Sequence, residues 1–277
     1  MIKVLLMLSF LFPVVAFAKS FSKKEISQIL NAVDKSEKKA LKPLLEDKRL
    51  RKTPDMVSYN ITEPIKLSLK KYKHFMEPYA IRLAKRFHKK WKPILKEAEK
   101  AYGVDQEAIV AILLVETSFG RFMGKYQPLS VFGSIYVDVE KIKGTKKYRE
   151  LPKKLKARFI KKQKWALKEL KAIANLTKKY PSLDQLKLQG SYAGAFGKCQ
   201  FLPSSYLNFA VPYRKSQVPD LFDEKDAIVS VANYLASNGF KDGLDSQGTY
   251  EAIYHYNNSD VYVKTVLGVA RKLNGTL

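Results

Sequence analysis

An almost unbroken apolar run at residues 108–115, AIVAILLV, constrains the fold of this 277-residue chain more than any other feature. The run lies in an expected helix of residues 105–117, which begins after Gly103 with Asp105 as its predicted N-cap. A helix that is apolar on nearly every face is buried. We therefore expect this helix at the centre of a domain, with other elements packed around it.

The other elements also show helical periodicity. Residues 79–101 predict one or two basic amphipathic helices, and residues 226–238 predict another apolar helix with Asp226 as its cap. Helical spacing of apolar residues recurs in residues 22–100 and 141–180. The sequence shows no internal repeat and no sustained alternation of apolar and polar residues. We therefore expect a mainly α-helical protein.

The charge of the chain is unusual, because 51 Lys and Arg residues oppose 26 Asp and Glu residues and leave a net charge of +25. Such a surface attracts polyanions, whether nucleic acid, anionic lipid or acidic cell-wall polymer. Residues 141–180 alone contain sixteen Lys and Arg residues. We favour a solvated helix face there, since long lysine stems commonly cover apolar surface. Contact with an acidic polymer is the alternative.

Residues 1–18 have the features of a secretory signal peptide. A short basic start precedes a mostly apolar stretch, and Ala16-Phe17-Ala18 fits the small residues of a cleavage site. The apolar stretch is shorter than the ~20 residues that a transmembrane helix needs. No cysteine follows the site, so we expect no lipid anchor. The expectation is a soluble, periplasmic or secreted bacterial protein, for which nucleic acid is an unsuitable partner.

Cysteine and histidine give no indication of a metal site. The single cysteine, Cys199, has no partner for an internal disulfide. None of the three histidines lies in a spacing that is typical of zinc binding. We therefore expect no metal and no cofactor, and a fold that depends on its hydrophobic core.

Glu116 stands at the C-terminal end of the apolar helix. Burial and the negative end of the helix dipole both disfavour a charged carboxylate there and raise its pKa. A carboxylic acid that is still protonated near neutral pH can donate a proton to the leaving oxygen of a glycosidic bond. The alternative is a glutamate that turns outward to solvent. Gly120 and Gly124 permit sharp turns just after it, and the 16 tyrosines suit sugar rings, so we favour a carbohydrate cleft.

The sequence resembles the lytic murein transglycosylase B family over residues 79–273. The matching segments, in chain order, are YGV (102–104), IVAILLVETSFGRFMG (109–124), GSYAGAFGKCQFLPSS (190–205), DAIVSVANYLASNGF (226–240) and YNNS (256–259). The resemblance implies a lysozyme-like (goose-type/transglycosylase) catalytic domain over residues 79–277, with a basic insertion at about 141–180. It also implies an α-helical N-terminal extension over residues 19–78.

The resemblance further implies roles for six residues. Glu116 matches the catalytic acid/base of the family. Five positions match substrate-binding residues of the cleft, namely Ser191, Gln200, Tyr234, Tyr256 and Asn257. Three of them have a structural alternative: Tyr234 as a core residue, Ser191 as a turn residue and Asn257 as a helix cap.

The implied function is that of a peptidoglycan lytic transglycosylase, which cleaves the β-1,4 bond between N-acetylmuramic acid and N-acetylglucosamine. One glutamate acts first as acid and then as base, while the muramyl C6 hydroxyl closes a 1,6-anhydro ring in a unimolecular step. Typical glycosidases use two carboxylates, and we find no second acid beside Glu116 in the sequence. The expected partners are peptidoglycan glycan strands and acidic cell-envelope polymers, and we expect a monomer.

Three other functions stay open at this point. A lysozyme-type muramidase would use water in place of the C6 hydroxyl. A basic wall-binding protein would have lost catalysis, although the presence of Glu116, Gln200 and Asn257 argues against this. Nucleic-acid binding driven by charge is disfavoured by the expected export.

One departure from the family pattern concerns calcium. Family members can carry a calcium-binding loop after the QFxPSS motif. The corresponding residues 211–220 contain one acid, Asp220, and two cations, Arg214 and Lys215. Because calcium takes six to eight oxygen ligands, we expect no calcium site here.

Overall fold

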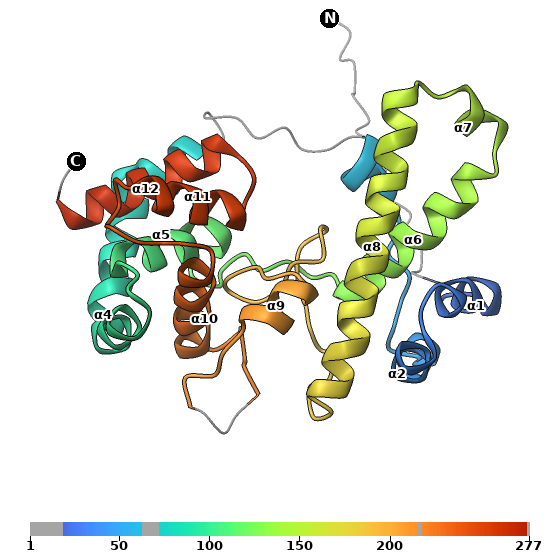
Figure 1. The fold of residues 1–277 in the computed structure, drawn as a ribbon, viewed down its shortest axis with the longest axis horizontal. Coiled ribbons are helices and arrows are strands. Elements are labelled where there is room, and N and C mark those ends of the chain that lie inside the picture. Colours follow the sequence, from blue (N-terminus) through green and yellow to red (C-terminus); the bar gives the residue numbers. More distant parts are fainter. Residues whose placement is uncertain (1–18, 63–71, 215–217, 276–277) are drawn as a thin grey trace, which may run out of the picture.

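A computed structural model describes residues 19–62, 72–214 and 218–275, and within these ranges the chain forms helices and turns but no β-strand (Figure 1). The mainly α-helical fold is confirmed. The expected signal peptide, residues 1–18, lies outside the described residues. The elements are α1 (Lys23–Asn31), α2 (Lys35–Glu46), η1 (Ser58–Thr62), η2 (Lys73–Met76), α4 (Pro78–Tyr102), α5 (Gln106–Thr117), α6 (Pro128–Lys143), α7 (Lys146–Glu150), α8 (Lys153–Lys179), α9 (Pro203–Phe209), α10 (Glu224–Ser237), α11 (Gln247–Tyr256) and α12 (Asp260–Asn274).

The helices form two groups, each around its own hydrophobic cluster. α4, α5, α10, α11 and α12 enclose the first cluster, and α1, α2, α6, α7 and α8 enclose the second. α9 and the loop of residues 190–202 lie between the two groups (Figure 1). Loops of the chain come together in this middle region, and loops that a rigid scaffold positions commonly carry functional residues.

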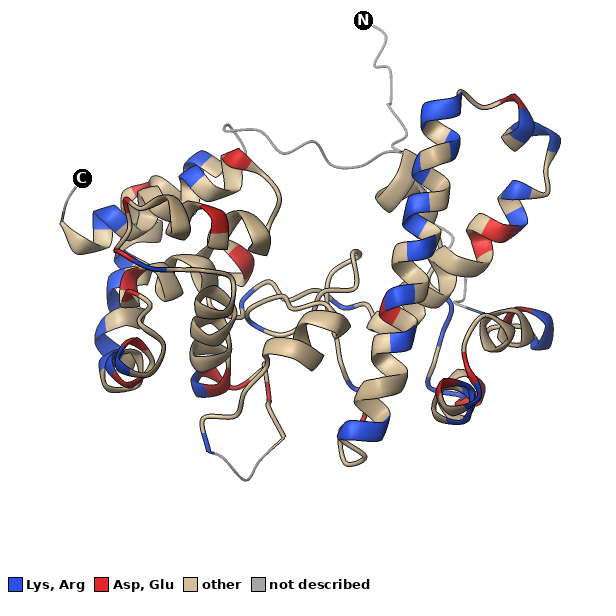
Figure 2. Cartoon of the chain, viewed as in Figure 1, with Lys and Arg blue, Asp and Glu red and all other residues tan. Residues whose placement is uncertain are grey.

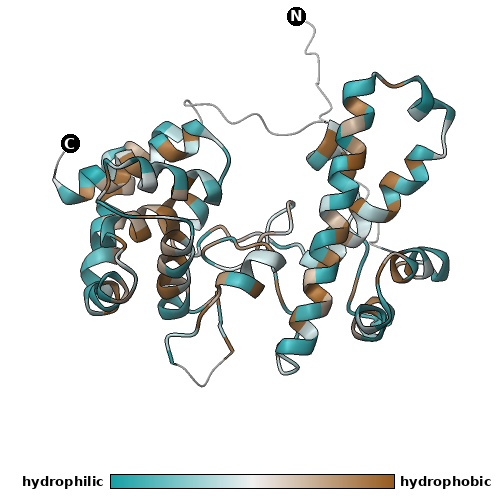
Figure 3. Ribbon diagram, viewed as in Figure 1, coloured by the Kyte–Doolittle hydropathy of each residue, from teal (hydrophilic) through white to brown (hydrophobic). Residues whose placement is uncertain are grey.

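α5 is the central helix of the first group, as its sequence predicts. Residues 108–115 are at most 8% exposed, and α4, α10 and α12 pack around them. Figure 3 shows α5 as a hydrophobic helix among helices with hydrophilic outer faces. The prediction of Asp105 as the N-cap is confirmed for its position but not for a capping hydrogen bond. Asp105 lies at the N-cap position, but its carboxylate accepts no capping hydrogen bond, and its pKa is raised by burial and by nearby Glu107 and Glu99.

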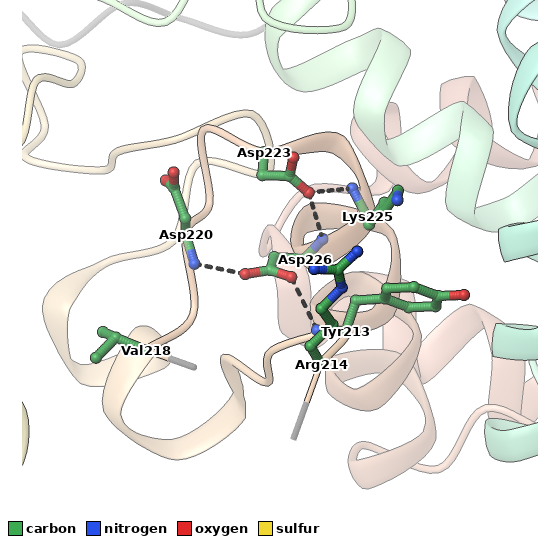
Figure 4. Close-up of a pocket in the computed structure, with 7 residues that line it drawn as sticks. All are labelled: Tyr213, Arg214, Val218, Asp220, Asp223, Lys225 and Asp226. Atoms are coloured by element: carbon green, nitrogen blue, oxygen red, sulfur yellow. Dashed lines mark hydrogen bonds between the residues drawn. The ribbon is translucent and has the colours of Figure 1, made fainter. Parts of the chain in front are cut away.

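α10 begins earlier than the sequence predicts. Its N-cap is Asp223, whose carboxylate accepts hydrogen bonds from the backbone N–H groups of Lys225 and Asp226. Asp226, the predicted cap, is buried in the first turn instead. It accepts hydrogen bonds from the backbone N–H of Tyr213 at 2.8 Å and of Asp220 at 2.7 Å (Figure 4). The carboxylate of Asp226 therefore joins the two ends of the loop that precedes α10.

The second group unites distant parts of the sequence. α1 and α2 each begin with a capping box. They present Ile29 and Leu41 to a cluster that also contains Phe132 of α6 and Ile173 of α8, all at most 2% exposed. The region before α4 therefore shares a hydrophobic core with the basic stretch. Among the described residues, no helix is long and apolar enough to cross a membrane.

Candidate active site

Glu116 lies in the last turn of α5, where the chain changes direction sharply. Residues 118–120 all have positive φ, between 48° and 90°, a conformation that only glycine adopts freely. Thr117 holds this turn, because its Oγ1 donates a hydrogen bond to the Lys198 carbonyl at 2.7 Å and accepts one from the Gly120 N–H at 2.9 Å. The turn thereby fixes the end of α5 against the loop of residues 197–201.

The environment of Glu116 raises the pKa of its carboxyl group into the neutral range. The side chain is half-buried, and desolvation raises its pKa to about 7, although a hydrogen bond from Tyr262 lowers it. Tyr262 Oη donates that bond to Glu116 Oε1 at 2.5 Å. Near pH 7 about half of the molecules therefore carry a proton on Glu116, as the position of the residue on its helix predicts.

Tyrosine rings surround the acid. Tyr256 stacks on Tyr262 with ring centroids 6.4 Å apart, and Tyr72 meets Tyr262 edge-on at the same distance. Tyr256 Oη donates a hydrogen bond to the Cys199 carbonyl at 2.6 Å. Burial raises the pKa of both Tyr256 and Tyr262 well above the usual range, so both hydroxyl groups stay neutral donors. α11, α12 and the loop around Cys199 thus meet at Glu116.

Glycines bring the segment after α5 against the loop that starts at Gly190. Gly124 has a φ of +89°, and a Cβ atom there would lie 2.1 Å from the Gly190 carbonyl oxygen. Next to this contact, Tyr126 and Gly190 exchange backbone N–H···O hydrogen bonds of 2.9 and 2.8 Å. Gly120 also has positive φ, so the turns predicted at Gly120 and Gly124 are confirmed.

Gln200 links the same two segments through its side chain. Its Nε2 donates hydrogen bonds to the carbonyls of Gly197 at 3.0 Å and Met123 at 3.2 Å. Its backbone has a φ of 51°, which is rare for glutamine. Within the described residues its Oε1 accepts no hydrogen bond. The amide nitrogen therefore fixes the Gln200 side chain in place, while the amide oxygen has no hydrogen-bond donor among the described residues.

Two cavities flank the turn after α5. The first, of about 480 Å³, is lined by Glu116 and by side chains from η2, the first turns of α4 and the end of α5. The second, of about 630 Å³, is lined by residues 120–126 and, in the opposite loop, by Ser191. Arg121 and Phe122 line both cavities, and Phe122 is 75% exposed. Together the cavities suit an elongated ligand that passes Glu116.

The structure brings the predicted site residues together to different degrees. Tyr256 contacts Tyr262, the partner of Glu116, and Gln200 follows Cys199, the partner of Tyr256. Ser191 lines the second cavity, and its Oγ lies 3.4 Å from the Ala195 carbonyl that it donates to. The contacts that these residues make with substrate stay predictions.

Tyr234 and Asn257 are less directly placed. Tyr234 is 8% exposed, packs against Tyr256 with centroids 4.6 Å apart, and donates a hydrogen bond to the His255 carbonyl at 2.8 Å. It therefore supports Tyr256 from within the core. Asn257 is the C-cap residue of α11, and its side-chain amide forms no hydrogen bond with the rest of the described chain.

Sequence reasoning missed two residues near the acid. Tyr262 lies in none of the motifs that the sequence analysis used, although a buried tyrosine hydroxyl needs a partner and this is a usable signal. Glu77, the N-cap residue of α4, is exposed and lines the same cavity as Glu116. A second carboxylate is therefore present in the cavity, far from Glu116 in sequence.

The segment that corresponds to the family calcium loop does not suit calcium. Both carboxylate oxygens of Asp226 accept backbone N–H groups, and the cavity that Asp226 lines also contains the side chains of Arg214 and Lys225 (Figure 4). No group of three or more His, Cys, Asp or Glu residues that could hold a metal occurs in the described parts of the chain. Residues 215–217, which include Lys215, lie outside those parts.

In the described residues, a helical fold presents a protonatable carboxylate on the wall of a cavity, with buried tyrosines packed behind it, and this arrangement is typical of the lysozyme-like class of proteins. Solved structures agree on the fold. The Escherichia coli lytic transglycosylase Slt35 in complex with calcium matches 90% of this chain and 92% of that chain, with a TM-score of 0.69 and 20% identity. The catenated form of the lytic transglycosylase SltB1 from Pseudomonas aeruginosa matches 92% of this chain and 98% of its own chain, with a TM-score of 0.73 and 21% identity. The predicted lysozyme-like transglycosylase fold is confirmed.

The transglycosylase SLT domain family matches residues 14–248, so the chain belongs to this family. Membrane-bound lytic murein transglycosylase B of Escherichia coli (strain K12) is 31% identical over 171 residues. That match covers 62% of this chain and 42% of the length of the relative. The predicted membership of a family of lytic murein transglycosylases is therefore confirmed.

Proposed function

We propose that the chain is an exported peptidoglycan lytic transglycosylase, which cleaves the β-1,4 bond between N-acetylmuramic acid and N-acetylglucosamine and forms 1,6-anhydro-N-acetylmuramic acid. The observation that carries this proposal is Glu116, a carboxylic acid with a pKa of about 7 on the wall of a cavity of about 480 Å³. A protein of similar fold, SltB3 from Pseudomonas aeruginosa, has been solved in complex with NAG-anhNAM-pentapeptide, at a TM-score of 0.70 and 18% identity.

In the first step Glu116 donates its proton to the glycosidic oxygen. Tyr262 occupies Oε1, which leaves Oε2 without a hydrogen-bond partner among the described residues. Oε2 is therefore the oxygen that carries the proton toward the substrate. A pKa near the working pH suits this role, because the acid is protonated often and still gives up its proton readily.

In the second step the same carboxylate acts as a base. The bond between C1 and the protonated leaving oxygen breaks. The carboxylate removes the proton from the muramyl C6 hydroxyl, and the C6 oxygen forms the new bond to C1. Glu116 thereby regains its proton, and no water is consumed. The Tyr262 hydroxyl stabilises the carboxylate between the two steps, because a neutral tyrosine remains a donor throughout.

The remaining predicted residues bind the glycan in this proposal. Gln200 Oε1 and the amide of Asn257 have hydrogen-bonding capacity that the described residues leave unused. These groups suit the N-acetyl and hydroxyl groups of sugars. Ser191 contributes to the second cavity, and Tyr234 acts through Tyr256 by keeping that ring against Tyr262.

The location and domain division are also proposed. Residues 1–18 act as the signal peptide, and the protein works in the periplasm or outside the cell, where murein is found. Residues 79–277 form the catalytic domain, with the basic insertion at about 141–180. Residues 19–78 form a helical region that packs against that insertion through α1 and α2.

A second candidate function, a hydrolytic muramidase, is favoured by Glu77. A second carboxylate in the cavity of Glu116 is the part that a hydrolase needs to activate water or to form a covalent intermediate. The transglycosylase needs only one. The two functions therefore make opposite predictions for a change at Glu77.

The test is digestion of purified sacculi by the parent protein, by Glu116→Gln and by Glu77→Gln, with the soluble products analysed by mass spectrometry. We expect muropeptides one water lighter than hydrolysis products from the parent and from Glu77→Gln. Glu116→Gln should release none, because glutamine keeps the shape but cannot transfer the proton. Reducing-end products that disappear with Glu77→Gln would establish the hydrolase instead.

A further inference from the structure

α8 carries a row of lysines along its exposed side. We call Lys154, Lys161, Lys164, Lys168, Lys171 and Lys178 the lysine row. Their spacings of three, four or seven residues put them on one face of the helix. Figure 2 shows α8 as a helix with basic residues along its length and little acidic surface. The row extends over ~36 Å at 1.5 Å per residue.

The helix does not neutralise this row. Its one acidic residue, Glu169, is 1% exposed and faces α9, where Ser204 binds it through the backbone N–H at 2.9 Å and through Oγ at 2.8 Å. Lys171 is paired with the buried Glu37, with Nζ and Oε2 3.7 Å apart. Lys164 and Lys168 form no ion pair or hydrogen bond with any described residue. Two exposed cations at the centre of the row are thus available to a partner.

A groove of about 480 Å³ lies beside these two lysines, between α8, α2 and α9. Lys164, Lys168 and Lys171 line it, as do the amides of Asn175 and Asn208. Neither amide forms a hydrogen bond with another described residue. The groove therefore combines unpaired positive charge with unused donors and acceptors, which a solvated helix face does not require.

We propose that this groove binds an extended acidic peptide, the chemical class to which the peptide stems of murein belong. The inference rests on the proposed function and adds a second contact with the same polymer. Lys164 and Lys168 are one turn apart, ~6 Å along the helix axis, and groups on the same side of an extended peptide recur every ~6.6 Å. Two carboxylates then pair with the two lysines, while the peptide bonds meet Asn175 and Asn208.

The form of the surface favours a chain over a lipid bilayer. Membrane-surface helices place large apolar side chains beside their basic residues, and these insert between lipids. Ile160, 43% exposed, is the one large apolar residue of α8 in the exposed class. The unpaired lysines line a shallow, open groove between three helices, along which a single extended chain can lie.

α9 connects the groove to the reaction site. Ser204 and Asn208 line the groove from α9, and Gln200 lies just before this helix in the loop that contacts the segment after α5. α9 has seven residues, so it spans ~10 Å. A stem held in the groove therefore anchors the polymer close to the cleft without occupying it.

The test compares two double variants, both made in the Glu116→Gln protein so that no substrate is cleaved. Lys164→Gln/Lys168→Gln removes the two unpaired cations. Lys85→Gln/Lys89→Gln is the matched control, because it removes the same charge at the same spacing from exposed positions on α4, in the other helix group. Binding is measured by sedimentation with intact sacculi and with stem-free glycan strands prepared from them with an amidase. A cooperative thermal transition that lies no lower than that of the Glu116→Gln protein establishes that each double variant is folded.

We expect Lys164→Gln/Lys168→Gln to bind intact sacculi about tenfold more weakly than the control, in line with two exposed charge pairs. Stem-free strands should bind all three proteins equally. Equal binding of the two double variants to sacculi would overturn the proposal, as would an equal loss on stem-free strands. Loss of binding to phosphatidylglycerol vesicles, with sacculus binding unchanged, would overturn it in favour of a membrane.

Cleavage by the protein with Glu116 intact is recorded in parallel and separates this inference from the proposed function. Anhydro products together with equal sacculus binding by the two double variants would remove the groove proposal and leave the transglycosylase. Absence of anhydro products would remove both.

Discussion

Glu116, the proposed acid, lowers the stability of the folded protein. Its pKa in the folded protein is about 7, above the ordinary value of 4.5, because burial disfavours its charged form. Between these values the folded state holds a proton that the unfolded state has lost, so the free energy of unfolding falls as the pH rises from 4.5 to 7. The buried carboxyl group thus opposes folding most strongly above pH 7, where it is ionised in the folded protein.

Glu116→Gln should therefore stabilise the protein at alkaline pH. A difference of 2.5 in pKa corresponds to about 3 kcal/mol, which the variant should gain over the parent at pH 8 but not at pH 4. Denaturant unfolding at the two pH values measures this difference. A stability gain that is the same at both would show that desolvation of Glu116 is not its source.

Tyr262→Phe tests the hydrogen bond to Glu116. In the proposed mechanism cleavage needs the protonated acid, so its rate should fall above about pH 7. The bond from Tyr262 lowers the pKa of Glu116, so its removal should move this alkaline limb to higher pH and lower the maximal rate, since the carboxylate formed in the first step loses its donor. The pH profile of product release from sacculi is the measurement.

Tyr234→Phe is the control for this variant. It removes a hydroxyl group whose hydrogen bond goes to the His255 carbonyl and not to Glu116. It should leave the alkaline limb where it is, whatever its effect on stability. A shift of equal size in both variants would contradict a specific role for the hydroxyl of Tyr262.

At the scale of elements, the contact between Gly124 and Gly190 holds the cleft loops together. Gly124→Ala should lower the free energy of unfolding by more than ~2 kcal/mol, because the new Cβ meets the Gly190 carbonyl and the backbone has positive φ. Gly239→Ala has nearly the same φ, +91°, but meets nothing within 4 Å, and should cost ~1 kcal/mol. Chemical denaturation of both variants separates the steric clash from the backbone strain, and equal losses would exclude the clash.

Asp226 holds together the two described ends of the segment before α10. Because Asp226 accepts both backbone N–H groups directly, we expect the melting temperature to be the same in millimolar calcium chloride and in EGTA. Asp226→Ala should lower it in both, by leaving two backbone donors unpaired. A rise in melting temperature with calcium in the parent protein would reveal a bound ion, since a ligand of the folded state stabilises it by mass action.

Periodicity predicted the helices well and their boundaries less well. The apolar run fixed the place of α5, and an amphipathic pattern over residues 79–101 became α4. The start of α10 was misplaced because Asp223 and Asp226 are both suitable caps in sequence. Only the approach of Tyr213 and Asp220 decides between them.

The same limit applies to the site. Glu116 was predicted because the cause of its pKa shift, an apolar helix, is local in sequence. Tyr262 reaches the acid through the packing of α12 against α5, whereas Glu77 enters the same cavity through the position of η2 and α4. Such contacts depend on which helices pack together. Periodicity predicts the apolar face of each helix but not the helix that packs against it.

At the scale of the whole molecule, α8 connects the two hydrophobic clusters. Its Phe159 and Ile173 belong to the second cluster, while Leu176 belongs to the first, which also contains α5. The basic stretch is therefore structural on its inner side and charged on its outer side. This arrangement explains how a segment with sixteen Lys and Arg residues is part of the fold rather than a solvated tail.

The net charge of +25 should itself limit stability, because self-repulsion disfavours the compact state. The melting temperature should therefore rise as sodium chloride is increased to about 0.5 M, where charges are screened over less than ~10 Å. At low salt, Lys164→Gln/Lys168→Gln should melt at a higher temperature than the parent, and its melting temperature should rise less as salt is added. Lys52→Gln should instead lose stability, because Lys52 bridges Glu25 at 2.7 Å and Asp138 at 2.5 Å. A melting temperature that falls with salt in the parent would show that such ion pairs outweigh the repulsion.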